Sequence, residues 1–191
     1  MRIPSVQSRK TSTVSLAAIA VTLSCLASGC GPSIQLSSDR YFPLFDPAPL
    51  ADYRGRAIVM RSFENVDEQT TFYSYRGSGQ RYGGPVLSSY FWYCFRSAFE
   101  RLGVEVLEEG GSSAAVPVMG MRLVRINDAS FTADVMLAAP DGRALQKRYT
   151  VAGPPVASRA APDLEQRAYQ MVSSLFWAVA ASPEFRAIVT R

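Results

Sequence analysis

Few residues of this 191-residue chain have the types and spacing that catalysis or metal binding require. Histidine is absent, which removes the commonest general base and the commonest metal ligand. A serine nucleophile would have to use Lys147 as its base, but Lys147 lies in a strand-like stretch with no matching motif. The glycines at 77–84 are not followed by the Lys-Ser/Thr of a phosphate loop. We therefore expect no catalytic residue, no metal and no cofactor.

Acidic side chains are the remaining candidates for acid–base chemistry. They form three close pairs: Glu108 with Glu109, Asp67 with Glu68, and Asp163 with Glu165. Glycan hydrolysis needs two carboxylates on opposite sides of a cleft, which spacing along the chain cannot show. All three pairs lie in predicted loops or at element ends, where solvated charge is the ordinary interpretation. A hydrolase is therefore an alternative hypothesis rather than the main one.

Cys30 has the sequence context of a lipid-modification site. Three basic residues stand near the N-terminus, no charge occurs from Thr11 to Ser38, and residues 14–26 are apolar. That apolar stretch has the length of a signal core and is shorter than the roughly 20 apolar residues that span a bilayer. Small residues then precede Cys30, a pattern that resembles the lipobox of bacterial lipoprotein precursors. In that family a peptidase cuts before the cysteine, whose thiol carries a diacylglyceryl group.

We predict that residues 1–29 are a cleaved signal peptide and that Cys30 carries the lipid. Several acyl chains on one cysteine would hold the protein on a membrane, because each buried methylene contributes about 0.8 kcal/mol. Cys25 is a competing candidate with a poorer context, and an ordinary cleaved signal is the other alternative. In proteobacterial lipoproteins, an Asp directly after the lipid-carrying cysteine resembles a retention signal for the inner membrane. This chain has Gly31 at that position, so the signal is absent. We therefore expect an outer-membrane lipoprotein that faces the periplasm.

Cleavage would change the charge balance. The first 29 residues hold Arg2, Arg9 and Lys10 and no acidic residue, which leaves 17 basic and 16 acidic residues. A nearly neutral chain offers no basic stripe for nucleic acid, so we reject that partner. The single thiol beyond Cys30 would be Cys94, in an apolar run, which we interpret as a small buried hydrophobe.

The mature chain is predicted to be one domain, 56–191, after a proline-containing tether, 30–55. Proline fixes φ and removes a hydrogen-bond donor, which favours irregular chain. The tether also contains Tyr41, Phe42, Leu44 and Phe45, which are too apolar for a free linker. We therefore expect part of it to dock on the domain.

Hydrophobic periodicity predicts an α+β fold. Strands are expected over 56–63, 104–108, 116–126, 131–137 and 145–151, and helices over 86–102, from Pro162 to about 181, and over 184–190. The last three strands form an antiparallel meander, and the strands before and after the first helix could lie parallel. The predicted architecture is an antiparallel or mixed sheet of about four or five strands. Two main helices pack on one face, with a short C-terminal helix.

Aromatic residues outside the predicted core stripes suggest a contact surface. The long connection 64–85 mixes tyrosines with glycines and arginines, and the first helix is aromatic on more than one side. The alternative for 64–85 is a mobile loop without a partner, and the alternative for the first helix is that other parts of the domain cover all its aromatic side chains. The candidate partner contacts are Phe72, Tyr73, Tyr75, Tyr90, Trp92 and Tyr93.

The order of elements is similar to that of known envelope lipoproteins. The chain begins with a lipobox-like segment and a proline-containing linker, followed by a predicted strand over 57–61. A helix that ends at Leu102-Gly103 and a strand at 104–106 come next, and Ser182-Pro183-Glu184-Phe185 lie near the C-terminus. This order resembles the auxiliary lipoproteins of ABC-type lipid-transport systems and the YajG-type lipoproteins. The resemblance implies an outer-membrane-anchored, non-enzymatic subunit whose partners are envelope proteins. An envelope glycan-binding protein or hydrolase is the alternative, and direct lipid carriage is a third hypothesis.

Overall fold

The computed structural model describes residues 34–66, 82–83, 87–110, 115–127, 129–155 and 160–191. The predicted signal peptide and Cys30 lie outside these residues, as do Phe72, Tyr73 and Tyr75. The strands are β1 (Ile34–Gln35), β2 (Ala57–Met60), β3 (Glu64–Asn65), β4 (Tyr82–Gly83), β5 (Glu105–Glu108), β6 (Val118–Ile126), β7 (Ser130–Ala138) and β8 (Ala144–Ala152). The helices are α1 (Leu87–Arg101), α2 (Ala161–Ala180) and α3 (Pro183–Val189), with two 3-10 helices, η1 (Ser38–Arg40) and η2 (Ala48–Tyr53).

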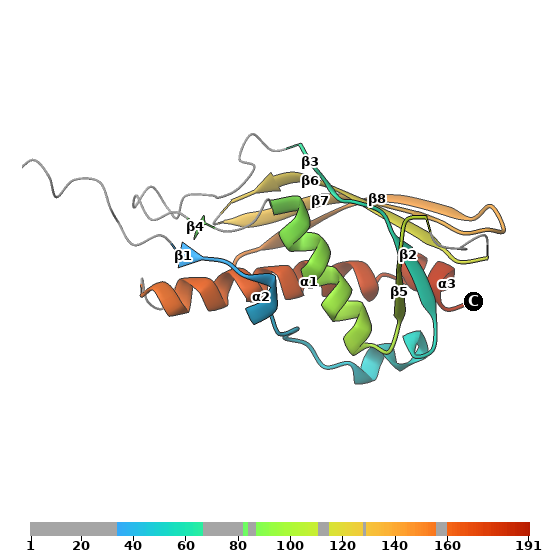
Figure 1. Ribbon diagram of the computed structural model, residues 1–191, viewed down its shortest axis with the longest axis horizontal. Coiled ribbons are helices and arrows are strands. Elements are labelled where there is room, and N and C mark those ends of the chain that lie inside the picture. The colour runs from blue at the N-terminus through green and yellow to red at the C-terminus, as the bar shows by residue number, and fades with distance from the viewer. Residues whose placement is uncertain (1–33, 67–81, 84–86, 111–114, 128, 156–159) are drawn as a thin grey trace, which may run out of the picture. The chain divides into compact units, whose positions relative to one another are not determined.

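The main sheet is mixed and has the strand order β5-β2-β6-β7-β8, with β3 also paired to β6 (Figure 1). β2 runs parallel to both β5 and β6, while β6, β7 and β8 form an antiparallel meander. β1 and β4 form a separate parallel pair. The five main strands are those predicted, and the parallel pairing of the strands before and after α1 is confirmed. The two-residue strands β1, β3 and β4 were not predicted.

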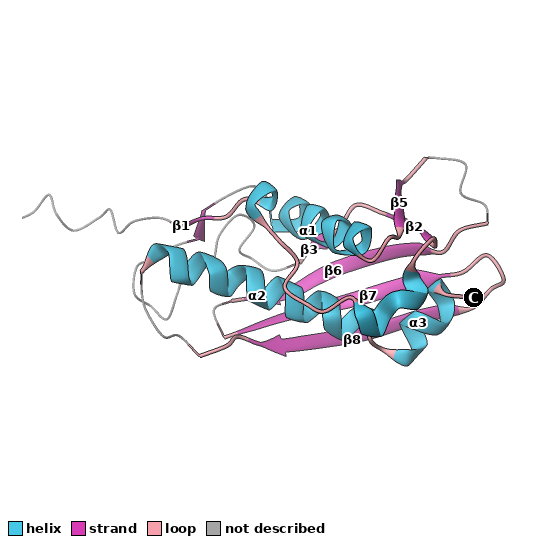
Figure 2. Cartoon of the chain, turned by 90° about the horizontal axis from the view of Figure 1, so that it is seen from below, coloured by secondary structure: helices cyan, strands magenta, loops and turns pink. Residues whose placement is uncertain are grey.

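The helices cover one face of the sheet, as Figure 2 shows for α1 and α2. Strand β7 explains why: Phe131, Ala133, Val135 and Leu137 are buried, and the residues between them are half-buried or exposed. This period of two gives the sheet one face that needs covering and one that water can reach. The predicted α+β class and the helix layer on one face are confirmed.

Helical spacing predicts one apolar stripe on α1, made of Leu87, Phe91, Cys94, Ala98 and Leu102. α1 is buried beyond this stripe, because it packs against both the sheet and α2. Phe95 and Phe99 of α1 make edge-on contacts with Phe176 of α2, with ring centroids 5.4 and 4.9 Å apart. Cys94 is fully buried, which confirms its interpretation as a core residue, and this burial raises the pKa of its thiol. No helix of the described ranges is long and apolar enough to cross a membrane.

The segment 36–53, which we call the N-terminal strap, lies along α2. The Ser173 hydroxyl contacts the Tyr41 hydroxyl at 3.1 Å and accepts a hydrogen bond from the Leu44 N–H, also at 3.1 Å. At the far end of the strap, the buried Tyr53 hydroxyl donates to the Ala180 carbonyl at 2.8 Å. Tyr41 is buried and Phe45 packs against the core, whereas Phe42 and Leu44 remain 61% and 41% exposed. The expected docking of part of this segment is therefore present, but two of the four apolar side chains that suggested it are not buried by it.

Gly103 ends α1 with a φ of +78°. This left-handed conformation disfavours residues with a Cβ. A Cβ at this position would also lie 3.2 Å from Cγ of Arg54. The turn directs the chain into β5, which runs parallel to β2. The last residues of these two strands, Met60 and Glu108, therefore lie side by side and next to α1.

Candidate functional site

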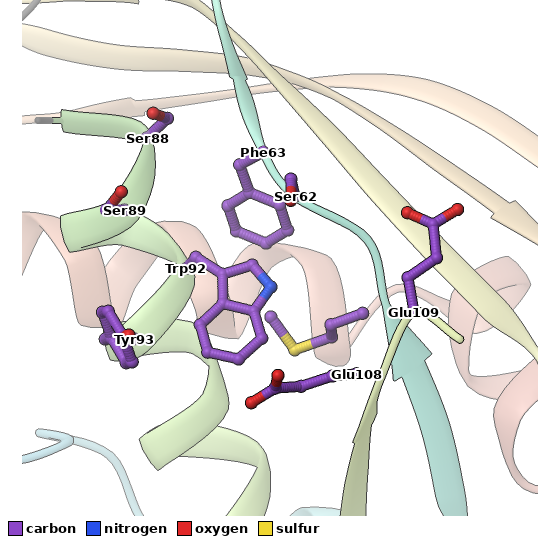
Figure 3. Close-up of a pocket in the computed structure, with 9 residues that line it drawn as sticks. Ser62, Phe63, Ser88, Ser89, Trp92, Tyr93, Glu108 and Glu109 are labelled. Atoms are coloured by element: carbon purple, nitrogen blue, oxygen red, sulfur yellow. The ribbon is translucent and has the colours of Figure 1, made fainter. Parts of the chain in front are cut away.

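A groove of about 350 Å³ lies between the N-terminal half of α1 and the ends of β2 and β5 (Figure 3). It is lined by Met60, Ser62, Phe63, Ser88, Ser89, Trp92, Tyr93, Glu108 and Glu109. Met60 and Phe63 are buried and form part of its apolar wall. Trp92 projects from α1 toward the strands, and Tyr93 lies farther from the strands and is 53% exposed. The groove thus combines an apolar wall, the rings of Trp92 and Tyr93, three serine hydroxyls and two carboxylates.

Helical spacing places the α1 side of the groove. Ser88, Trp92 and Arg96 are four residues apart, so they follow one another along the same side of the helix. Ser89 and Tyr93 form the adjacent row. The Trp92 and Tyr93 rings meet edge to face, with centroids 5.0 Å apart. The two rows therefore present polar residues at the start of the helix and aromatic rings one turn later.

Arginines neutralise the acidic side of the groove. Arg96 bonds Glu100 at 2.8 Å and Glu108 at 3.2 Å, and its guanidinium lies 5.7 Å from the centre of the Trp92 ring. The hydrogen bond to Glu100 raises the pKa of Arg96. Arg61 pairs with Glu109 at 3.1 Å. The site therefore offers both charges close to an aromatic surface. With Glu100 included, these two arginines and three glutamates leave a net charge of −1.

The two carboxylates of the groove come from the same segment of the chain. Glu108 is the last residue of β5 and Glu109 follows it, so both belong to one wall of the groove (Figure 3), whereas glycan hydrolysis uses two carboxylates on opposite sides of the bond that is cut. Each is also paired with an arginine. Among the described residues there is no group of three His, Cys, Asp or Glu side chains that could hold a metal ion.

The predicted contact residues have different positions. Trp92 and Tyr93 line the groove. The expectation of an exposed Tyr90 is wrong: Tyr90 is 1% exposed and packs edge-on against Phe91, because α1 buries a wide face between the sheet and α2. Phe72, Tyr73 and Tyr75 fall outside the described residues.

Several residues of the groove were not predicted as site residues. Ser62, Ser88 and Ser89 carry no motif, and Glu108 and Glu109 were interpreted as solvated charge. The four-residue spacing of Ser88 and Trp92 was the available signal on α1. No sequence signal shows that β5 returns beside this part of the helix, because that contact depends on the parallel pairing of β2 and β5.

A second hollow, of about 530 Å³, lies over β6, β7 and β8. Val118, Gly120, Met136 and Ala138 contribute to it. These residues alternate with the buried residues of their strands, so they belong to the sheet face opposite the helices. The missing side chain of Gly120 helps to form the hollow, since a Cβ there would come within 3.5 Å of Met136.

The chain was compared with protein-family models, curated proteins and solved structures. No protein-family model matches the chain, and no curated protein matches it. A solved structure, the rare lipoprotein B from Shewanella oneidensis, is similar over 63% of this chain and 87% of its own, with 14% identity and a TM-score of 0.25. The fold and groove define an α+β domain with an aromatic groove beside its sheet edge.

Proposed function

We propose that the protein is a lipid-anchored lipoprotein of the bacterial cell envelope that acts as a non-catalytic binding or assembly subunit. The anchor is Cys30, in the outer membrane, with the domain in the periplasm. The groove beside α1 is the contact surface for an envelope protein, a lipid-transport complex being one such partner. The lipobox-like context of Cys30 supports the anchor.

The observation that carries the binding role is the exposed aromatic surface at the groove. Tyr93 is 53% exposed, and Trp92 beside it is half-buried with Arg96 near its ring. Tryptophan, tyrosine and arginine are the residues enriched at the energetic centres of protein interfaces. A buried role does not account for Tyr93, whose neighbours on the inner side of α1 already fill the core.

The absence of histidine supports a non-catalytic role, and so does the arrangement of the groove carboxylates. Both are bound to arginines and stand on the same wall. General acid–base catalysis would need a proton-transfer group free to reach a substrate.

Site-specific photo-crosslinking in the native envelope tests this proposal. A photoreactive residue at Tyr93 should capture one discrete envelope protein. The same residue at Gln170, an exposed position on α2, is the matched control and should not capture it. Equal capture at both positions, or capture of abundant bystanders alone, would contradict the proposed surface.

Glycan binding is the second candidate, because an aromatic ring flanked by hydroxyls and charged groups also suits a sugar. Trp92 offers the stacking surface, and Ser88 and Glu108 offer hydrogen-bonding groups. Sedimentation with purified cell-wall glycan decides between the two. Retention of the wild type and loss with Trp92→Ala would favour the glycan, and no retention of the wild type would remove this candidate.

A further inference from the structure

The edge strand β8 carries a row of backbone groups that face away from the sheet. β8 pairs with β7 over its whole length and ends the strand order. Two hydrogen bonds fix the alternation of this ladder: the Ala139 N–H donates to the Arg143 carbonyl at 2.8 Å, and the Gly153 N–H donates to the Ala129 carbonyl at 2.7 Å. Bonded and non-bonded pairs alternate in antiparallel strands. The odd-numbered residues of β8 therefore bond to β7, and the even-numbered residues direct their N–H and C=O groups outward.

The outward row consists of Ala144, Gln146, Arg148, Thr150 and Ala152, and all five are exposed. In the described part of the chain, no backbone or side-chain group hydrogen-bonds to the N–H or C=O of these five residues. Among the residues that the structure describes, no strand pairs with the outer edge of β8. A row of this kind is a template for an additional antiparallel strand.

β8 lacks most of the features that prevent edge pairing. Such features are short strands, prolines, bulges and charged side chains. β8 is nine residues long, contains no proline and keeps an unbroken register with β7. Its two charges are neutralised within the chain: Lys147 bonds Glu184 at 3.0 Å, and Arg148 bonds Asp134 through two contacts of 2.6 and 2.8 Å. The opposite edge, β5, is only four residues long and has glutamates at both ends.

We propose that β8 is a homodimer interface, in which two copies of this chain pair their β8 strands in antiparallel register. A two-fold axis at Arg148 is the register that uses all five outward residues. It pairs Ala144 with Ala152, Gln146 with Thr150, and Arg148 with its own counterpart in the second copy. This ladder would contain about ten backbone hydrogen bonds, two for each pair.

The side chains of β8 match in this register. On the helix side of the sheet, Leu145 would lie opposite Val151 of the second copy, and Lys147 opposite Tyr149 of the second copy. The first is an apolar pair, and the second places an ammonium beside an aromatic ring. Arg148 would lie opposite Arg148 of the second copy, and each guanidinium is already held by a carboxylate of Asp134. The strand is therefore complementary to itself.

The dimer would leave the aromatic groove accessible. The groove lies beside β5, and β5 and β8 are opposite edges of the sheet. The two grooves would stand at the two ends of a continuous sheet. The dimer does not depend on the identity of the groove's partner, so either proposal can fail without the other.

Disulfide trapping of the full chain in its own membrane tests the register. The double variant Gln146→Cys/Thr150→Cys places two cysteines opposite each other, with Cα atoms about 5.5 Å apart, within the range that a disulfide spans. Mild oxidation should convert most of it to a covalent dimer on a non-reducing gel. Each single variant is a matched control, because its two cysteines would be about 13 Å apart along the strands. Cys94 is buried and does not compete.

Sedimentation of the full chain in a density-matched detergent provides a second measurement. The wild type should sediment as a dimer, and Gln146→Pro as a monomer. The Gln146 N–H faces outward, so a proline there is compatible with the β7 pairing but blocks a second strand. A wild type that sediments as a monomer would overturn the proposal. So would single cysteine variants that crosslink as well as the double variant, or a folded double variant that stays monomeric.

Discussion

Replacing Tyr53 by phenylalanine tests whether the N-terminal strap stabilises the folded domain. The Tyr53 hydroxyl is buried and donates to the carbonyl of Ala180, in the last turn of α2. Carbonyls in the last turn of a helix have no partner within the helix. Loss of the donor leaves a buried acceptor unsatisfied, which costs about 1–3 kcal/mol. At about 2–4 °C per kcal/mol for a domain of this size, Tyr53→Phe should lower Tm by about 4–8 °C at the middle of that range.

The assay is thermal unfolding of the full chain followed by circular dichroism. Tyr93→Phe is the matched control, since it removes the same hydroxyl from a side chain that is 53% exposed. The control should stay within about 0.5 kcal/mol of the wild type. If Tyr53→Phe unfolds with the control, the strap does not contribute through this hydrogen bond and the reasoning is refuted.

Three further predictions concern the sheet, a turn and the core. Asp134→Asn should reduce stability by less than about 1 kcal/mol at neutral pH. Arg148 holds the pKa of Asp134 below its usual range, so this stability is present above the unfolded-state pKa of about 3.9 and is lost as pH falls through the folded-state pKa. Urea titrations of both proteins from pH 7 to 2 should therefore converge at acid pH, and a constant gap would contradict the ion pair. Gly142 lies in the turn between β7 and β8 and, like Gly103, has a positive φ. Gly103→Ala should lower the free energy of unfolding more than Gly142→Ala, because only Gly103 has a neighbour at contact distance. Equal losses in chemical denaturation would show that the close approach is irrelevant. Cys94 should react with a thiol reagent only as fast as the domain unfolds, because its thiol is buried with a raised pKa; rapid labelling of the native protein would contradict its place in the core.

Much of the fold could be predicted because its patterns are local. Alternation in β7 and the four-residue spacing in α1 each follow from which side chains must face the core. The turn at Gly142 and the end of α1 at Gly103 carry their own residue signatures. The short strands β1, β3 and β4 could not be predicted in this way, because two-residue pairings are set by the elements beside them.

The candidate site was predictable only in part. Trp92 and Tyr93 were recognised because they lie off the apolar stripe of α1. Tyr90 was misplaced on the surface, since a single sequence does not show that α2 and the sheet together cover so much of the helix. The contribution of Glu108 depends on a contact between β5 and α1 that is distant from any motif.

The lipid on Cys30 is the central claim, and mass spectrometry of the N-terminal peptide tests it most directly. The full chain should be expressed in a bacterium and recovered from the membrane fraction. The account predicts that the mature protein begins at Cys30 and that this peptide carries the mass of a diacylglyceryl group with its acyl chains. Cys30→Ser should carry no lipid and leave the membrane fraction. An unmodified Cys30, or a mature N-terminus at any other residue, would contradict the account.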